Sequence, residues 1–180
     1  MDQTVRATEL DIESHGLVLP NGLRLHHVKV SLPQTTMQFS PFAFPEGSRM
    51  NVEVVATAND LQNYLNEKNP GGLSNFRVTA EDGQIRVVGV MRMILPVEVG
   101  ALGTLEFSDA RLNFVPKRVE MAGAKAPAAL VKEHLDKLNP LIDLSGWPVE
   151  TNVKEITIGG GEIRLSASIV LTAPVPRREP

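Results

Sequence analysis

Two segments of the chain repeat the same hairpin pattern. Thr79–Gly89 reads TAEDGQIRVVG and Thr157–Ala167 reads TIGGGEIRLSA, so in each a turn glycine is followed by Gln or Glu, then Ile and Arg. Glycine permits the tight turn of a hairpin, and side chains alternate between the two faces of the strand that follows. The repeat therefore predicts two equivalent hairpins, with Ile85 and Ile163 facing one common apolar interior and the neighbouring arginines pointing away.

Strand patterns also dominate the rest of the chain. In Arg24–Leu32 the alternation places Leu25 and His27 on one face and Val28 on the other. Gln84–Leu95 is long enough to span roughly 35–40 Å as a strand. Glycines at positions 89, 100 and 103 predict that the sheet bends strongly.

Two stretches have the period of a helix instead. Leu61, Tyr64 and Leu65 lie on one helical face, after a start signal from Thr57 with Asp60, or from Asn59 as an alternative cap, and before the stop signal NPGG. A second helix is predicted from Pro127 to the NP pair at positions 139–140. Its apolar stripe comprises Leu130, Val131, His134, Leu135 and Leu138.

The order of these elements is strands, helix, hairpin, strands, helix, hairpin, which predicts an α+β fold. Because the turns between strands are short, the sheet should be mostly antiparallel. We expect one long, strongly bent sheet packed around two helices. It should form a single domain over residues 1–172, followed by a Pro-rich flexible tail over residues 173–180.

Composition excludes several classes of function. The chain has no cysteine, which excludes thiol nucleophiles, disulfides and thiolate metal sites. The net charge of -3 and the single Trp and Tyr argue against a nucleic-acid-binding surface. The amino terminus lacks the pattern of a signal peptide. The chain also contains no apolar run of about 18 residues, which is the length that a membrane-spanning helix needs. We expect a cytoplasmic protein, or one of the cell envelope where a leader has been removed.

A catalytic hypothesis would rest on His26, His27 and His134. His26 and His27 are neighbours in a strand and point to opposite faces, so they are poorly placed to share one metal ion. His134 lies on the apolar face of the second predicted helix. Motifs for a serine nucleophile or a phosphate-binding loop are absent. We therefore predict no catalytic residue, no metal ligand and no cofactor.

Apolar residues lie on both faces of the central strands. One hypothesis is that a curved sheet lines an apolar groove for a lipid or another amphiphile, with peripheral contact to a membrane. The alternative is a structural or interaction module whose apolar face is closed by self-association or by a partner; the pattern leaves the oligomeric state open. In the lipid hypothesis, acyl chains would lie against Met91, Met93, Leu105, Phe107, Leu112, Phe114, Leu135 and Leu138, with Arg111, Lys117 and Arg118 near a phosphate at the rim.

Six segments in a fixed order add a resemblance to a known family. They are GLRLHHVKVSL, VVATANDLQNYL, GQIRVVG, LEFSDARLNFVPKRVEM, LNPLIDLSGWPVE and ITIGGGEIRLSA. Over roughly Gly22–Leu171 the chain resembles the LmeA-like phospholipid-binding family, a bacterial group. The resemblance implies a non-enzymatic phospholipid-binding protein with a tubular fold that holds acyl chains between a bent sheet and helices. Family members often carry an export signal or lipid anchor, and this chain shows neither. The family motif defines no ligand-contacting residues.

Overall fold

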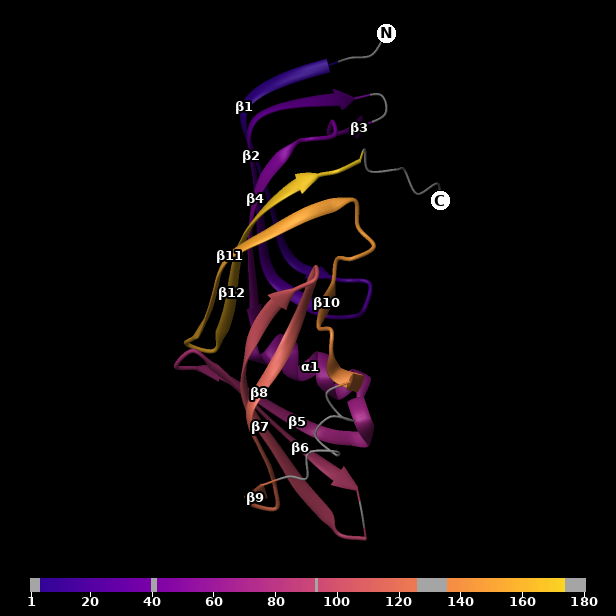
Figure 1. The fold of residues 1–180 in the computed structure, drawn as a ribbon, viewed down its shortest axis with the longest axis vertical. Coiled ribbons are helices and arrows are strands. Elements are labelled where there is room, and N and C mark those ends of the chain that lie inside the picture. Colours follow the sequence, from indigo (N-terminus) through magenta and orange to yellow (C-terminus); the bar gives the residue numbers. More distant parts are fainter. Residues whose placement is uncertain (1–3, 40–41, 93, 126–135, 174–180) are drawn as a thin grey trace.

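The computed structural model describes residues 4–39, 42–92, 94–125 and 136–173. Its strands form two six-stranded sheets that follow one another along the long axis of the molecule, with α1 between them (Figure 1). Every strand pair in the described ranges is antiparallel. The predicted α+β, mostly antiparallel class is therefore confirmed.

The first sheet has the order β1-β2-β4-β12-β11, with β3 paired to β2. Its strands are β1 (Thr4–Val18), β2 (Arg24–Phe39), β3 (Phe42–Ala43), β4 (Arg49–Thr57), β11 (Val149–Gly159) and β12 (Glu162–Leu171).

The second sheet has the order β10-β8-β7-β6-β5, with β9 paired to β8. Its strands are β5 (Leu73–Glu81), β6 (Gln84–Arg92), β7 (Pro96–Ser108), β8 (Arg111–Met121), β9 (Ala124–Lys125) and β10 (Ile142–Asp143).

The strands divide into two sheets where the sequence pattern suggested one. The division arises because β4 pairs with β12, from the far end of the chain, while the chain after β4 turns into α1 (Ala58–Lys68) and the short helix η1 (Pro70–Gly72). The next strand, β5, then begins the second sheet. Of the second predicted helix, only Asp136–Leu138 lies within the described residues, where it is helical. Positions 126–135, and the predicted tail from position 174, lie outside them.

The two repeated hairpins have the same two-residue turn. Asp82 and Gly83 have φ values of 51° and 75°, and Gly160 and Gly161 have φ values of 61° and 78°. Positive φ at both central residues is the requirement of a type I′ turn, whose twist matches that of the flanking strands. The glycines thus fix the turn that the sequence pattern predicted.

These two turns also bond to each other. The Gly83 N–H donates to the Ile158 carbonyl (2.9 Å), and the Gly161 N–H donates to the Ala80 carbonyl (2.9 Å). Ile158 and Ala80 hold equivalent places in the two copies, so the contact has the reciprocity of a two-fold axis. The hairpins therefore join the two sheets tip to tip.

The interior that both hairpins enter is one continuous core. Ile85 is fully buried and Ile163 is 8% exposed, and both belong to the same cluster of packed side chains, whereas Arg86 and Arg164 are exposed. The prediction that the two isoleucines face a common interior is confirmed.

Helix α1 begins and ends as its sequence predicts. The Thr57 side chain caps the helix and Asp60 reciprocates, so Asn59 does not serve as the cap; Asn69 ends the helix in the left-handed conformation. The predicted apolar face is buried. On another side, the Asn66 amide bonds to both the N–H and the carbonyl of Phe76. Helix α1 thereby covers part of the outer edge of β5.

One prediction about β2 was wrong. The pairing of β1 with β2 is interrupted at Gly16, where φ is +68°, between the His15–His27 pair and the Leu17–Leu25 pair. The regular alternation of faces fails at this irregularity. As a result Leu25 lies on the interior side of the sheet together with Val28, and not on the face of His27.

Gly103 lies at a bulge between β7 and β8 and provides a test of the packing there. A Cβ atom at Gly103 would lie 2.3 Å from the Val115 carbonyl oxygen and 2.8 Å from Pro116 Cα, so Gly103→Ala forces the backbone of β8 to shift. We expect a loss of about 1–3 kcal/mol in the free energy of unfolding, measured by urea denaturation.

Gly100→Ala is the matched control for that substitution, because the nearest atom to its Cβ would be Val88 Cγ2 at 3.8 Å. It should change stability by less than about 0.5 kcal/mol. Equal stabilities of the two variants would contradict the close packing at Gly103.

Candidate functional site

An apolar cavity of about 250 Å³ lies between the concave side of the first sheet, α1 and the strands β7 and β8 of the second. Among the described residues of its lining, no side chain titrates; Thr151 contributes a hydroxyl and Trp147 an indole N–H, and the others are hydrocarbon. The described lining residues are Leu17, Leu19, Leu23, Leu25, Val28, Val52, Val54, Ala56, Leu61, Leu105, Phe107, Leu112, Leu141, Ile142, Leu144, Trp147, Thr151, Val153, Ile156, Ile163, Leu165, Ala167 and Ile169.

The largest wall of the cavity comes from the alternation of β4 and β12. Because side chains alternate along a strand, every second residue of β12 from Ile163 to Ile169 points into the cavity. The antiparallel register sets Val54 opposite Leu165 and Val52 opposite Ala167. The two strands thus present one unbroken apolar surface.

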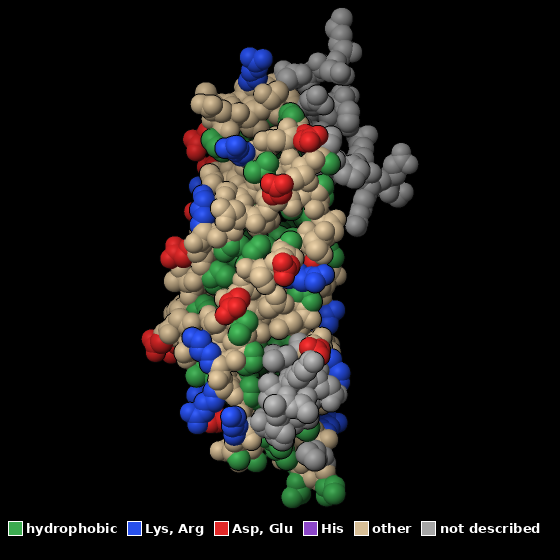
Figure 2. Space-filling model, viewed as in Figure 1, with side chains coloured by type: hydrophobic (Ala, Val, Ile, Leu, Met, Phe, Trp, Pro, Cys, Tyr) green, Lys and Arg blue, Asp and Glu red, His purple; other side chains and the backbone are tan. Residues whose placement is uncertain are grey.

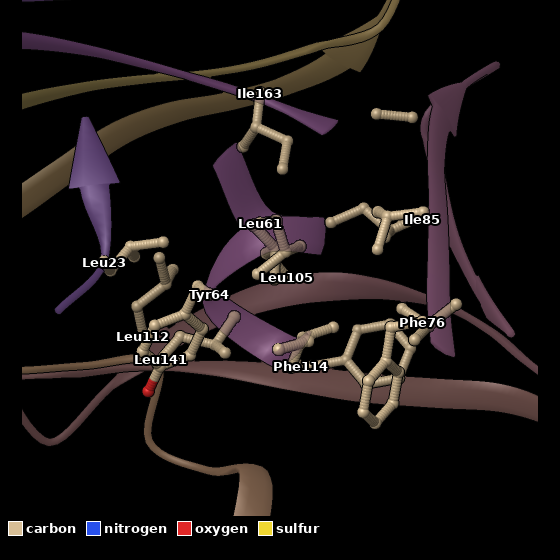
Figure 3. Close-up of a cluster of buried hydrophobic side chains, with 14 of the residues drawn as sticks. Leu23, Leu61, Tyr64, Phe76, Ile85, Leu105, Leu112, Phe114, Leu141 and Ile163 are labelled. Carbon is tan, nitrogen blue, oxygen red and sulfur yellow. The ribbon is translucent and has the colours of Figure 1, made fainter. Parts of the chain in front are cut away.

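One end of the cavity is closed by tightly packed side chains. Figure 3 shows them converging from α1, from both sheets and from the segments that flank the sheets. Each is less than a tenth exposed; they are Leu23, Leu61, Leu105, Leu112, Leu141 and Ile163. This end of the cavity is therefore continuous with the core.

Other lining residues are open to solvent. Leu17 is 41% exposed and Trp147 is 54% exposed, so these two side chains mark a mouth. Within the described lining, Thr151 carries the buried hydroxyl Oγ1, for which no hydrogen-bond partner is found. The cavity therefore has a closed end, an open end and, among its described lining residues, one unsatisfied hydroxyl.

The structure brings together part of the predicted acyl-chain set. Leu105, Phe107 and Leu112 line the cavity, and Phe114 is buried in the adjoining core. Met91 and Leu138 pack against the outside of that core. Met93 and Leu135 lie outside the described residues.

Sequence reasoning missed the wall contributed by β4, β11 and β12, and it missed Trp147. The alternation of apolar residues in β4 and β12 was visible in the sequence. However, no local sequence signal indicates that these two strands pair, because all the strands of the second sheet lie between them in the chain. That pairing is what turns two apolar strand faces into one wall.

The predicted rim cations are spread along β8. Arg111 bonds through Nε to Asp143 Oδ2 (3.1 Å), beside the Leu112–Ile142 pair that lines the cavity. Arg118 pairs with Glu120 and lies in a separate shallow depression, together with Arg86. Lys117 is exposed and precedes Arg118 in β8, five positions after the lining residue Leu112. Of the three, Arg111 is the one next to a lining residue.

Comparison with known proteins identifies the family of the chain. A family model described as LmeA-like phospholipid-binding matches residues 4–168. This chain belongs to the LmeA-like phospholipid-binding family. The match to the LmeA-like family spans strands of both sheets, α1 and most of the cavity lining. No curated protein and no solved structure matches the chain. Among the described residues of this family member, no helix is long and apolar enough to cross a membrane.

A buried carboxylate holds the floor of the cavity in place. Asp60, which is 3% exposed, precedes the lining residue Leu61. Asp60 Oδ2 accepts hydrogen bonds from the Thr57 hydroxyl (2.7 Å) and N–H (3.0 Å), and Oδ1 accepts from Arg24 Nη1 (2.9 Å). Burial raises the pKa of Asp60, but the bonds from Thr57 and Arg24 outweigh it, so the net pKa lies below its ordinary value. The ionised side chain thus ties α1 to β2 and to the end of β4.

Asp60→Asn tests this anchor. The variant leaves Arg24 without its anionic partner and weakens the helix cap, so we expect it to lose about 1–3 kcal/mol of unfolding free energy at neutral pH. Because the folded pKa is lowered, the wild-type advantage is complete above the unfolded pKa of about 3.9 and is lost as pH falls through the folded value. Urea denaturation of both proteins across pH should show the difference shrinking in acid.

Asp82→Asn, in an exposed turn where Asn tolerates positive φ, is the matched control and should leave stability nearly unchanged. A gap between wild type and Asp60→Asn that stays constant down to strong acid would contradict the assignment of an ionised anchor.

Proposed function

We propose that this protein binds a phospholipid or similar amphiphile, with an acyl chain in the cavity between its two sheets. The observation that carries the proposal is the cavity itself, whose described lining is almost entirely hydrocarbon and which is closed at one end and open at the other. Membership of a phospholipid-binding family supports the same ligand class.

The size of the cavity favours the acyl chain over the head group as its occupant. At about 250 Å³ it is at the small end of ligand sites, and its described lining includes no cationic side chain for a charged phosphate. Each buried CH₂ contributes about 0.8 kcal/mol, so a chain inside is held without polar contacts. The head group would remain at the mouth, near the exposed Trp147 ring and on the side of Arg111.

Thr151 gives the site one polar contact. A buried hydroxyl without a partner costs free energy, and an ester carbonyl of a lipid would supply the missing acceptor. The same hydroxyl is a poor nucleophile, because no described residue of the lining could act as its base. We therefore infer binding or carriage of lipid, and no catalysis, at this site.

Filling the cavity provides the main test. Val52 lines the cavity and is half-buried, so Val52→Trp directs an indole into the space for the acyl chain. We expect the amount of lipid that co-purifies per protein, measured by organic extraction and mass spectrometry, to fall several-fold. Transfer of fluorescent phospholipid between vesicles should fall in parallel.

Asn51→Trp is the matched control, because Asn51 precedes Val52 in β4, is exposed and faces the other side of the sheet. It should retain wild-type lipid content. If wild-type protein carries no lipid, and light scattering shows a tight dimer that Val52→Trp disrupts, the cavity mouth is a self-association surface and the lipid proposal fails.

Contact with a membrane would be made at the far end of the second sheet. The connection between β6 and β7 lies at the lower end of the molecule, where Figure 2 shows hydrophobic side chains. Ile94 is 103% exposed and Leu95 is 73% exposed, and exposed Arg92 lies at the base of the connection. Adjacent apolar side chains at a tip suit insertion among lipid head groups, and a nearby cation suits anionic lipid. We propose that this tip docks on the membrane.

Replacing both tip residues by serine tests the docking surface. Ile94→Ser with Leu95→Ser should weaken co-sedimentation with phosphatidylglycerol-containing vesicles by about tenfold or more, since each side chain loses favourable transfer free energy. Stability should change little, because both side chains are already exposed in the folded state.

Val18→Ser, at a 60% exposed position in the first sheet, is the control and should sediment like wild type. Unchanged sedimentation of the tip variant would exclude the tip as the docking surface, and lipid content measured on the same protein would still report on the cavity.

A further inference from the structure

A cluster of metal-ligating side chains lies on the outer surface of the first sheet, away from the cavity lining. His15 on β1 and His27 on β2 are directly opposite in the strand register, and their rings stack with centroids 4.7 Å apart at 18°. Glu13, two residues before His15, lies on the same face. The potential ligand atoms of the three residues all lie within 4.8 Å of one another.

One atom of this cluster lacks the partner that burial demands. His27 Nε2 is shielded from solvent and has no hydrogen-bond partner among the described residues. Its nearest acidic atom, Glu13 Oε2, is 3.8 Å away, which is too far for a hydrogen bond. Buried polar atoms in folded proteins are nearly always satisfied, so this nitrogen points to a ligand that would satisfy it.

We propose that Glu13, His15 and His27 bind a divalent transition-metal ion of the Zn²⁺ class. Two imidazoles and one carboxylate form a donor set that Zn²⁺ and Cu²⁺ favour, and they leave a fourth position open. Tetrahedral coordination at about 2.0–2.1 Å places ligand atoms about 3.4 Å apart. Because a metal ion lies in the plane of each imidazole that binds it, the His15 ring would have to rotate out of its stack on His27. The exposed positions of Glu13 and His15 leave room for that change.

The surrounding charges suit a cation. Lys29 Nζ lies 3.3 Å from Asp11 Oδ2 and 3.9 Å from Glu13 Oε1, which leaves Oε2 of Glu13 facing His27. Glu53, on the next strand, also acts on Lys29. Three carboxylates therefore surround one ammonium group, and a divalent ion would enter a region of negative charge.

The site would join the edge of the sheet to its interior. β1 is an edge strand, so a metal held jointly by β1 and β2 would staple it to its neighbour. The site was not predictable from the sequence alone. The sequence suggests His26 as the neighbour of His27, whereas the residue that lies opposite His27 is His15, twelve positions earlier on the other strand.

Isothermal titration of ZnCl₂ into the untagged, chelator-treated full chain tests the proposal. We expect one ion per chain. His15→Ala and His27→Ala should each weaken Zn²⁺ binding by about tenfold or more, and Glu13→Gln should weaken it measurably. Cu²⁺ should bind more tightly than Zn²⁺. His26→Ala is the matched control, because His26 is exposed and outside the cluster, and it should bind like wild type.

Hydrogen exchange provides a second readout, in which saturating Zn²⁺ should slow exchange of β1 amides in wild type and not in His15→Ala. His15 is exposed, so His15→Ala should fold normally. Its Zn²⁺ binding therefore tests the proposal even if His27→Ala is destabilised. Absence of saturable binding, or equal weakening by His26→Ala and His15→Ala, would overturn the proposal.

Discussion

Two reciprocal backbone hydrogen bonds, from Gly83 to Ile158 and from Gly161 to Ala80, join the sheets of this protein. A third bond, from the Ala58 N–H to the Gly161 carbonyl (2.8 Å), attaches the start of α1 to the same turn. These three hydrogen bonds between the hairpin turns and α1 therefore fix the relative positions of the two sheets and of the helix between them. Because they use backbone atoms in turns that require positive φ, they depend on turn conformation more than on side-chain identity.

The cavity follows from this arrangement. Where the sheets meet, side chains pack into a core; farther along the first sheet the same apolar faces continue without a packing partner of equal size. An unfilled apolar cavity costs roughly 24 cal/mol per Å³, so a fully closed space of this volume would cost on the order of 6 kcal/mol, an upper bound here because the mouth is open. A bound acyl chain would recover part of that cost, which makes occupancy and stability linked properties.

Sequence patterns predicted the features that depend on neighbours along the chain. The cap at Thr57 and Asp60, the buried stripe of α1 and the inward isoleucines of the hairpins are set by local spacing and turn chemistry. The largest wall of the cavity, formed by β4 and β12, was not predictable in this way. It depends on pairs such as Ala56 with Ile163, which lie more than a hundred positions apart and leave no local signal. Pairing across strands likewise placed His15 against His27, and the irregularity at Gly16 displaced Leu25 from its expected face.

The position of β12 inside the first sheet, between β4 and β11, has a consequence for how the protein is made. β5 to β8 are consecutive hairpins, so most of the second sheet can assemble from contacts close in sequence as the chain emerges. β4 has one neighbour available early, β2, while its other side waits for the last strand of the fold. Until that strand is synthesised, the apolar surface of β2 and β4 has no continuation on the far side of β4. Completion of the first sheet and creation of the cavity are therefore a single, late event in biosynthesis.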